Sequence, residues 1–297
     1  MSTPRLGIDL GGTKIEGIVL DGGETRLRKR IATEAPGGYE HVLGRIVALV
    51  HELRETAPSV EAIGIGTPGS LSARTGLLKN SNTQCLNGRP LRADLERRLG
   101  LPVQMENDAN CFALAEATLG AGRGQELVFG VILGTGVGGG IVIRGRSWPG
   151  PQHIAGEWGH HSIDPSGPSC YCGQRGCVEA MLAGPALERA HREAGGADLR
   201  APEIAQLAAA GDPRASDVLA RYLERFGRAL ANVITILDPS VVVLGGGLSN
   251  LDVLYTRGRE EVAAGIFNDE LRTPIVRHEL GDSAGVIGAA LLARGER

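Results

Sequence analysis

The chain has 297 residues, of which 42% are hydrophobic and only 3% aromatic. Its formal net charge of −3 gives no basic excess for nucleic-acid binding, so we expect no nucleic-acid partner. No long apolar span occurs and Asp9 interrupts the apolar stretch near the N-terminus, so we expect neither a membrane helix nor a secretory signal.

The first 120 residues alternate strands and helices. Leu6–Leu10 is an apolar run that ends at two glycines, and it predicts a buried strand. A second strand at 15–20 follows directly and is expected to pair with the first. The remaining predictions for this part are a helix at 39–55, a strand at 62–67, a helix at 91–98, a strand at 102–105 and a helix at 110–120.

The rest of the chain repeats this alternation. Strands are predicted at 127–133 and 140–143, with a glycine-rich turn between them. Alternating strands and helices favour the α/β class. The later predictions are helices at 202–210 and 214–237, a strand at 241–244, a helix from about residue 250, a strand at 274–280 and a helix at 283–293.

One sequence pattern occurs twice. Gly7–Thr13 and Val131–Gly138 both lead an apolar strand into a glycine turn, roughly 125 positions apart. This repeat predicts two related lobes and a ligand that contacts both glycine turns from a cleft between them. The alternative is two unrelated hairpins in one sheet. We expect the lobes to be 1–119 and 120–297, with the last helix, about 283–297, packing back on the first lobe.

Both glycine turns are candidate phosphate sites, because consecutive glycines expose a row of backbone N–H groups. Gly134–Gly139 also matches G-x-G-x-x-G, but a β-branched strand follows it instead of the helix that a dinucleotide site requires. The alternative is that the glycines serve turn geometry alone. Asp9 suits Mg²⁺ held through water, or else it bonds N–H groups of its own turn. Polar groups beside the turns favour phosphate binding: Asp9, Thr13, Lys14 and Thr135.

Asn107-Asp108-Ala109-Asn110 follows a predicted strand and opens a helix. An aspartate at this position is often a helix cap, which is one explanation of Asp108. Two amides and a carboxylate at the end of a strand also suit the hydroxyl groups of a polyol. In that case Asp108 orients a substrate hydroxyl and accepts its proton. The residues alone leave both explanations open.

Three thiols and one imidazole lie close together in a glycine-rich segment. Thiolate and imidazole are the ligands that zinc prefers, and a complete set of four protein ligands indicates a structural site. Glu157 and Glu179 flank this segment and are not both needed as ligands, so we expect their carboxylates to face a polar substrate. His161 is interpreted as a surface residue, with metal binding as its alternative role. The predicted ligands are His160, Cys170, Cys172 and Cys177.

The two remaining cysteines, Cys85 and Cys111, are isolated in the sequence and predicted to be packing thiols. A cluster of candidate metal ligands together with isolated thiols indicates a reducing compartment rather than a disulfide framework. We therefore expect a cytoplasmic protein.

Four motifs in this order resemble the ROK family (repressors, open reading frames and sugar kinases). Asp9–Lys14 is similar to the family's first phosphate loop, and Gly134–Gly140 to its second. Asp238–Gly247 is similar to its strand and turn on the nucleoside side. Glu157–His160, with the cysteine segment that ends at Glu179, matches its zinc motif, which is the most specific of the four. The resemblance covers residues 5 to about 292.

The resemblance implies an actin-like (ribonuclease-H-like) duplicated two-lobe fold with an interlobe cleft, usually as a homodimer. Such proteins transfer the γ-phosphoryl group of ATP, with Mg²⁺, to the 6-hydroxyl of a hexose, and Asp108 is then the catalytic base. His160 would bind a structural Zn²⁺ through one ring nitrogen and a sugar hydroxyl through the other. The implied ATP and phosphate contacts are Asp9, Gly11, Gly12, Thr13, Lys14, Gly134, Thr135, Gly136, Gly138 and Gly246. The implied sugar contacts are Gly69, Asn82, Asn107, Asp108, Glu157, His160 and Glu179.

Different segments point to different sugars. Asn80–Thr83 with Leu86–Gly88 looks closest to bacterial fructokinases and mannokinases. Gly88–Leu95 and Asn110–Leu114 are also similar to N-acetylglucosamine kinases. We expect fructose or mannose as the preferred substrate, with N-acetylglucosamine or glucose as the alternative. The segment from His160 to Cys170 is short for the family, but we still expect zinc to bind.

Two other functions compete with a kinase. A transcriptional repressor of this family carries an N-terminal helix-turn-helix module, and only about four residues precede the first strand, so we expect no such module. A non-catalytic sugar sensor is disfavoured because Asp9, Asp108 and both phosphate turns are retained.

Overall fold

The computed structural model describes residues 3–293. Contacts between residues divide the chain into two units. Gly145–Ala155 groups with unit 1, whereas we expected it in the second lobe. Unit 1 is Met1–Gly120, Gly145–Ala155 and Leu280–Arg297, and unit 2 is Ala121–Arg144 and Gly156–Glu279.

Unit 1 is built on a five-stranded sheet. Its strands are β1 (Arg5–Leu10), β2 (Lys14–Asp21), β3 (Glu24–Ala32), β4 (Ile63–Thr67) and β7 (Val103–Asn107), in the order β3-β2-β1-β4-β7. β1 pairs antiparallel with β2 and parallel with β4, and β4 pairs parallel with β7. The short strands β5 (Ser70–Leu71) and β6 (Leu78–Lys79) form a two-stranded sheet of their own, and β10 (Arg146–Ser147) is an edge strand of the second five-stranded sheet.

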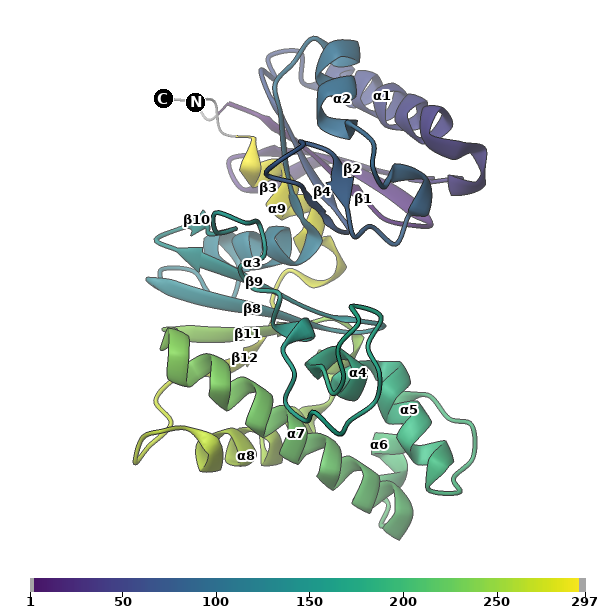
Figure 1. Cartoon of the computed structure of the whole chain (residues 1–297). Coiled ribbons are helices and arrows are strands. Elements are labelled where there is room, and N and C mark those ends of the chain that lie inside the picture. The colour runs from purple at the N-terminus through teal and green to yellow at the C-terminus, as the bar shows by residue number, and fades with distance from the viewer. Residues whose placement is uncertain (1–2, 294–297) are drawn as a thin grey trace. The chain divides into compact units, whose positions relative to one another are not determined.

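Helices pack on this sheet through apolar side chains. They are α1 (Gly38–Thr56), α2 (Leu91–Leu99), α3 (Asp108–Leu119) and α9 (Ala284–Leu292). α9, in yellow, lies beside β1, β4 and α3 (Figure 1). Its backbone approaches the sheet so closely that a Cβ on Gly64 would lie 1.7 Å from the carbonyl oxygen of Ala289. The C-terminal helix is therefore an integral layer of unit 1.

Unit 2 repeats the strand pairing of unit 1. β8 (Leu127–Leu133) pairs antiparallel with β9 (Val137–Ile143) and parallel with β11 (Val241–Gly245), which pairs parallel with β12 (Ile275–Arg277). The pairing of β8, β9, β11 and β12 has the same order and sense as that of β1, β2, β4 and β7. Its helices are α4 (Val178–Leu182), α5 (Gly184–Glu193), α6 (Ala201–Ala209), α7 (Pro213–Leu237) and α8 (Arg257–Gly265).

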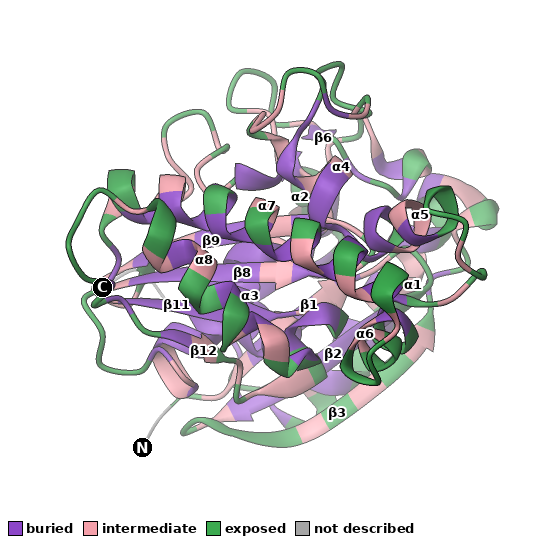
Figure 2. Cartoon of the chain, turned by 90° about the horizontal axis from the view of Figure 1, so that it is seen from below, coloured by how far each residue is buried: buried purple, intermediate pink, exposed green. Residues whose placement is uncertain are grey.

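The predicted α/β class is confirmed, but several elements differ from the prediction. The sequence did not predict β3, because this edge strand is half-buried or exposed along its length and lacks an apolar pattern (Figure 2). It also missed α4 and α5, which follow the cysteine segment directly. Two 3₁₀ turns replace the start of the helix that we expected from about residue 250, and α8 begins at Arg257. No helix within residues 3–293 is long and apolar enough to cross a membrane.

Candidate functional site

The first glycine turn connects β1 to β2 and is held by hydrogen bonds. The N–H of Gly11 donates to the carbonyl oxygen of Lys14 at 2.9 Å. Thr33 is fully buried just beyond β3, and its hydroxyl donates to the carbonyl oxygen of Gly11 at 2.7 Å. The N–H of Thr33 donates to the carbonyl oxygen of Thr13 at 2.9 Å. Thr33 therefore holds the backbone of the turn through two hydrogen bonds, a role that no motif in the sequence indicates.

Asp9 lies near the end of β1, directly before this turn. Burial, and to a smaller extent the nearby carboxylates of Asp108 and Glu16, raise the pKa of its carboxyl to about 6. A Cβ on Gly285, at the start of α9, would lie 3.5 Å from a carboxylate oxygen of Asp9. A divalent cation beside Asp9 would favour the charged form and offset the cost of burying it. The environment of Asp9 therefore suits a cation ligand.

Asp9→Asn is expected to stabilise the protein above pH 7. The pKa of Asp9 is about 6 in the folded protein, against an ordinary value of 3.8 in the unfolded chain. The protonated carboxyl therefore adds to the free energy of unfolding below about pH 4, and this contribution is lost as pH rises through 6. A shift of about two units corresponds to about 3 kcal/mol at pH 8. The neutral amide avoids this cost, so the free energy of unfolding in urea should rise by about 1–3 kcal/mol at pH 8. At pH 4 we expect no gain, and an equal gain at both pH values would contradict the raised pKa.

The helix cap at the start of α3 is Asn107, not Asp108. The side-chain oxygen of Asn107 accepts the N–H of Ala109 at 2.8 Å, and its amide group donates to the carbonyl oxygen of Gly69 at 3.2 Å. A carboxylate oxygen of Asp108 also lies 2.8 Å from the N–H of Ala109. Asp108 is half-buried in the first turn, where the helix dipole favours its ionised form. A half-buried carboxylate in this position can accept a proton from a bound hydroxyl.

Two other predicted sugar contacts lie in loops of unit 1. Gly69 has a φ of 83°, and a Cβ there would lie 2.3 Å from the carbonyl oxygen of Lys79, so the backbone itself requires glycine. Asn82 is exposed, and its side-chain oxygen would lie 3.7 Å from a Cβ on Gly12. Unit 1 therefore brings Asn82 to the first glycine turn.

The second glycine turn connects β8 to β9 and is shorter than predicted. β9 begins at Val137, so Gly138 lies within the strand rather than in the turn. The N–H of Gly134 donates to the carbonyl oxygen of Gly136 at 2.9 Å, and Thr135 is exposed between them. A carboxylate oxygen of Glu179, on α4, accepts the N–H of Val137 at 2.9 Å. Glu179, predicted as a sugar contact, thus bonds the backbone at the second glycine turn.

Gly246, in the predicted nucleoside turn, is required by packing. Its φ is 80°, and a Cβ would lie 2.3 Å from the carbonyl oxygen of Leu133 at the end of β8. The hydroxyl of Ser249 donates to the carbonyl oxygen of Gly246 at 2.7 Å. Close packing therefore fixes this turn against the end of β8.

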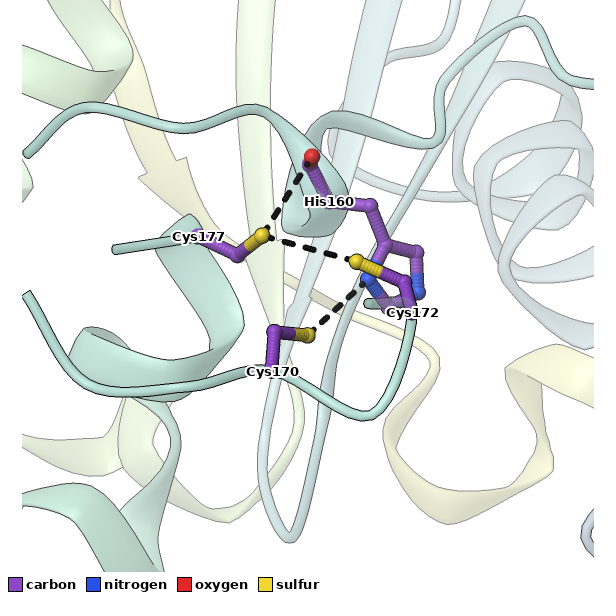
Figure 3. A group of neighbouring side chains, drawn as sticks. All are labelled: His160, Cys170, Cys172 and Cys177. Atoms are coloured by element: carbon purple, nitrogen blue, oxygen red, sulfur yellow. Dashed lines mark hydrogen bonds between the residues drawn. The ribbon is translucent and has the colours of Figure 1, made fainter. Parts of the chain in front are cut away.

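The four predicted metal ligands converge in unit 2 (Figure 3). One ligand atom from each of them lies within 4.8 Å of all the others. Cys170 Sγ is 3.6 Å from His160 Nδ1, and Cys172 Sγ is 3.6 Å from Cys177 Sγ. Tetrahedral zinc bonds give separations of about 3.6 Å for N and S and about 3.8 Å for two sulfurs. The donor set and its spacing therefore fit a zinc ion.

The thiols of the cluster differ in their surroundings. Burial raises the pKa of Cys177 to about 12, whereas a backbone hydrogen bond from Gln174 lowers the pKa of the exposed Cys172. Metal binding requires thiolates, so loading this cluster releases protons.

The imidazole of His160 presents its two nitrogens to different partners. Nδ1 points towards the sulfurs, while Nε2 lies 3.0 Å from the hydroxyl of Tyr171 and 4.0 Å from a carboxylate oxygen of Glu157. Burial, and to a smaller extent the nearby carboxylates of Glu179 and Glu157, raise the pKa of Tyr171 to about 12. The side of the imidazole away from the cysteines is thus rich in polar groups. The sequence did not single out Tyr171, which stands between two metal ligands.

The predicted site residues divide between the units. Unit 1 contains Asp9, Gly11, Gly12, Thr13, Lys14, Gly69, Asn82, Asn107 and Asp108. Unit 2 contains Gly134, Thr135, Gly136, Gly138, Glu157, His160, Cys170, Cys172, Cys177, Glu179 and Gly246.

Comparisons with known proteins cover nearly the whole chain. A model of the ROK family matches residues 5–296. N-acetyl-D-glucosamine kinase of Photobacterium profundum is 39% identical over 297 residues, which cover 96% of this chain and 98% of that protein. The ROK hexokinase of Thermus thermophilus is 38% identical, with a TM-score of 0.86 and 97% of each chain covered. A ROK glucokinase of Streptomyces griseus, solved with glucose and AMPPNP, is 32% identical, with a TM-score of 0.79, covering 98% of this chain and 99% of that one. These structures confirm the predicted actin-like fold.

Proposed function

Because the chain belongs to the ROK family and is a sugar kinase, we propose that it transfers the γ-phosphoryl group of ATP to the 6-hydroxyl of N-acetylglucosamine. One observation carries the choice of sugar: curated N-acetyl-D-glucosamine kinases of three bacteria are each 39% identical to it over 96–97% of its length. These relatives favour the alternative that we drew from the sequence over fructose or mannose.

Glucose is the second candidate substrate. The structures similar to this chain include a ROK hexokinase and a ROK glucokinase solved with glucose. A coupled assay of ADP release across about ten free and N-acetylated hexoses, with kcat/KM for each, separates the candidates. We expect the highest kcat/KM for N-acetylglucosamine. A higher value for glucose, fructose or mannose would replace the proposed substrate.

In the proposed mechanism Asp108 orients the 6-hydroxyl and accepts its proton as O6 attacks the γ-phosphorus. The new O6–P bond forms while the bond from phosphorus to the β,γ-bridging oxygen breaks. ADP leaves with that bond's electron pair, and the proton held by Asp108 passes to solvent. The position of Asp108 in the first turn of α3 supports this role, because the helix dipole favours negative charge at a helix N-terminus.

The glycine turns would hold the phosphates of ATP. Backbone N–H groups at each turn, together with the exposed ammonium of Lys14, can stabilise charge that develops on the phosphoryl oxygens. Magnesium, when bound with ATP, neutralises phosphate charge, and Asp9 is the carboxylate that we propose to face it. The raised pKa of Asp9 supports this assignment, because a buried carboxyl gains most from an approaching cation.

The cysteine cluster would position the sugar-binding side chains. His160 Nδ1 and the three cysteine sulfurs would hold the zinc ion, and this bond would fix the orientation and tautomer of the imidazole. Nε2 then faces away from the sulfurs, close to Glu157, and both groups can bond sugar hydroxyls once a sugar hydroxyl replaces that of Tyr171 at Nε2. We also propose that the protein works as a homodimer in the cytoplasm, as the resemblance to the family implies.

Glu157→Gln is expected to raise KM for the sugar about tenfold and to change KM for ATP less than twofold. The substitution removes a charged acceptor beside His160 Nε2 and keeps the shape of the side chain. Initial rates measured against each substrate in turn give the two constants. If KM for ATP rises more than KM for the sugar, Glu157 does not belong to the sugar site.

A further inference from the structure

The second glycine turn is hydrogen-bonded to α4 at one end and to α5 at the other. At one end the carboxylate of Glu179 accepts the N–H of Val137 at 2.9 Å. At the other end the carbonyl oxygen of Gly134 accepts the N–H of Gly184, the first residue of α5, at 2.8 Å. A Cβ on Gly136 would lie 2.7 Å from the same carboxylate oxygen of Glu179. The side chain of Glu179 therefore lies directly against the turn.

Helix α4 is also tied to the cysteine cluster. α4 begins at Val178, the residue after the buried ligand Cys177, and the N–H of Val178 donates to the carbonyl oxygen of His161 at 2.9 Å. Glu179 follows one residue later and lies in the first turn of the helix. The cluster, α4 and the glycine turn thus form one hydrogen-bonded segment within unit 2.

We propose that Glu179 is a positioning residue for ATP: its carboxylate holds the turn of Gly134–Gly136 in the shape that binds phosphates. The inference rests on the proposed assignment of this turn to ATP. It extends the role of Glu179 beyond that of a sugar contact. It also makes α4 the element through which the cysteine cluster supports the nucleotide as well as the sugar.

The physical reason is the freedom of a glycine-rich turn. A turn with two glycines in three residues has many accessible backbone conformations. The free energy of binding must then offset the conformational entropy that is lost when the turn is ordered. The hydrogen bond from the N–H of Val137 to the side-chain oxygen of Glu179 can hold one conformation before the nucleotide arrives. Losing this bond should weaken nucleotide binding about tenfold.

Equilibrium titration of the zinc-loaded protein with a non-hydrolysable ATP analogue, without sugar, tests this inference. Glu179→Ala should bind the analogue about tenfold more weakly than the wild type. Glu179→Gln should bind it within about twofold of the wild type, because the amide oxygen can still accept the N–H of Val137. If Glu179 were only a sugar contact, both variants would raise KM for the sugar and neither would change analogue binding.

Gly134→Ala separates this inference from the function that it rests on. No protein atom lies within 4 Å of a Cβ at Gly134 and its φ is not positive, so the alanine costs the fold little. It should nevertheless obstruct a phosphate held at the turn and weaken analogue binding. Unchanged binding by Gly134→Ala would remove the assignment of the turn to ATP. Weakened binding by Gly134→Ala, together with wild-type binding by Glu179→Ala, would overturn the role of Glu179 alone.

Metal analysis and thermal unfolding accompany each titration. If Glu179→Ala does not fold, Glu179→Asp takes its place, because it keeps the charge but shortens the reach to Val137. We expect Glu179→Asp to bind the analogue at least about threefold more weakly than Glu179→Gln. Wild-type affinity in Glu179→Asp would overturn the inference.

Discussion

Asp108→Asn should lower kcat by about a thousandfold and leave the affinity for ATP within about twofold of the wild type. The amide keeps the shape of the side chain, and its oxygen can still accept the N–H of Ala109. The amide cannot accept a proton from the sugar, so only the rate of the chemical step should fall. Single-turnover rates with N-acetylglucosamine, together with titration of a non-hydrolysable ATP analogue, measure the two effects separately.

Asp198→Asn is the matched control for this substitution. Asp198 is an exposed carboxylate that pairs with Arg192 on the surface of unit 2, so its neutralisation should leave kcat unchanged. Substantial turnover by Asp108→Asn would remove the assignment of the base. A parallel loss of ATP affinity would show that Asp108 acts in nucleotide binding instead.

Cys172→Ser should abolish stoichiometric zinc binding and raise KM for the sugar at least about tenfold. Cys172 is exposed, so the serine removes a ligand without opening a cavity in the core. Loss of the metal frees His160 Nδ1, and the ring is then no longer held with Nε2 towards the polar groups. Metal analysis of the purified variant and sugar-dependent initial rates provide the two measurements.

Cys85→Ser controls for the loss of a thiol outside the cluster. Cys85 is half-buried and is not one of the four converging ligands, so this variant should keep both zinc and sugar affinity. Full sugar affinity in a zinc-free Cys172→Ser protein would show that the metal is not needed for sugar binding. Retention of zinc by Cys172→Ser would show that the cluster does not need this thiolate.

The fold could be predicted well where apolar patterns are strong. The buried strands at Leu127–Leu133 and Val241–Gly245 are continuous apolar runs, and Arg5–Leu10 is apolar apart from Arg5 and Asp9. Each prediction lies within a residue of the observed strand. The long helix Pro213–Leu237 was found for the same reason. The edge strand β3 was missed, because its partly exposed, charged side chains give no pattern of burial.

The candidate site was only partly predictable, because sequence motifs do not show which groups hold the backbone. The motifs identify the glycine turns, yet Thr33 and Glu179, which fix those turns, can be assigned these bonds only from the structure. In the same way, the sequence left capping open as a role for Asp108, and the structure gives the cap to Asn107. Hydrogen bonds between residues far apart in the chain are the information that the motifs lack.

The sugar could not be read from local motifs. Asn80–Thr83 suggested fructose or mannose, but this segment lies in a single loop whose shape depends on its neighbours. The amide of Asn87, for example, bonds both the N–H and the carbonyl oxygen of Ser81. Identity over the whole chain instead favours N-acetylglucosamine. Substrate choice depends on contacts that a four-residue pattern does not contain.

A crystal structure with N-acetylglucosamine and a non-hydrolysable ATP analogue tests the central claim most directly. We predict that a carboxylate oxygen of Asp108 lies about 2.6–3.2 Å from O6 of the sugar. We also predict that the phosphates contact both glycine turns, Gly11–Thr13 and Gly134–Gly136. A structure in which another side chain meets O6, or in which the phosphates contact neither turn, would contradict the account.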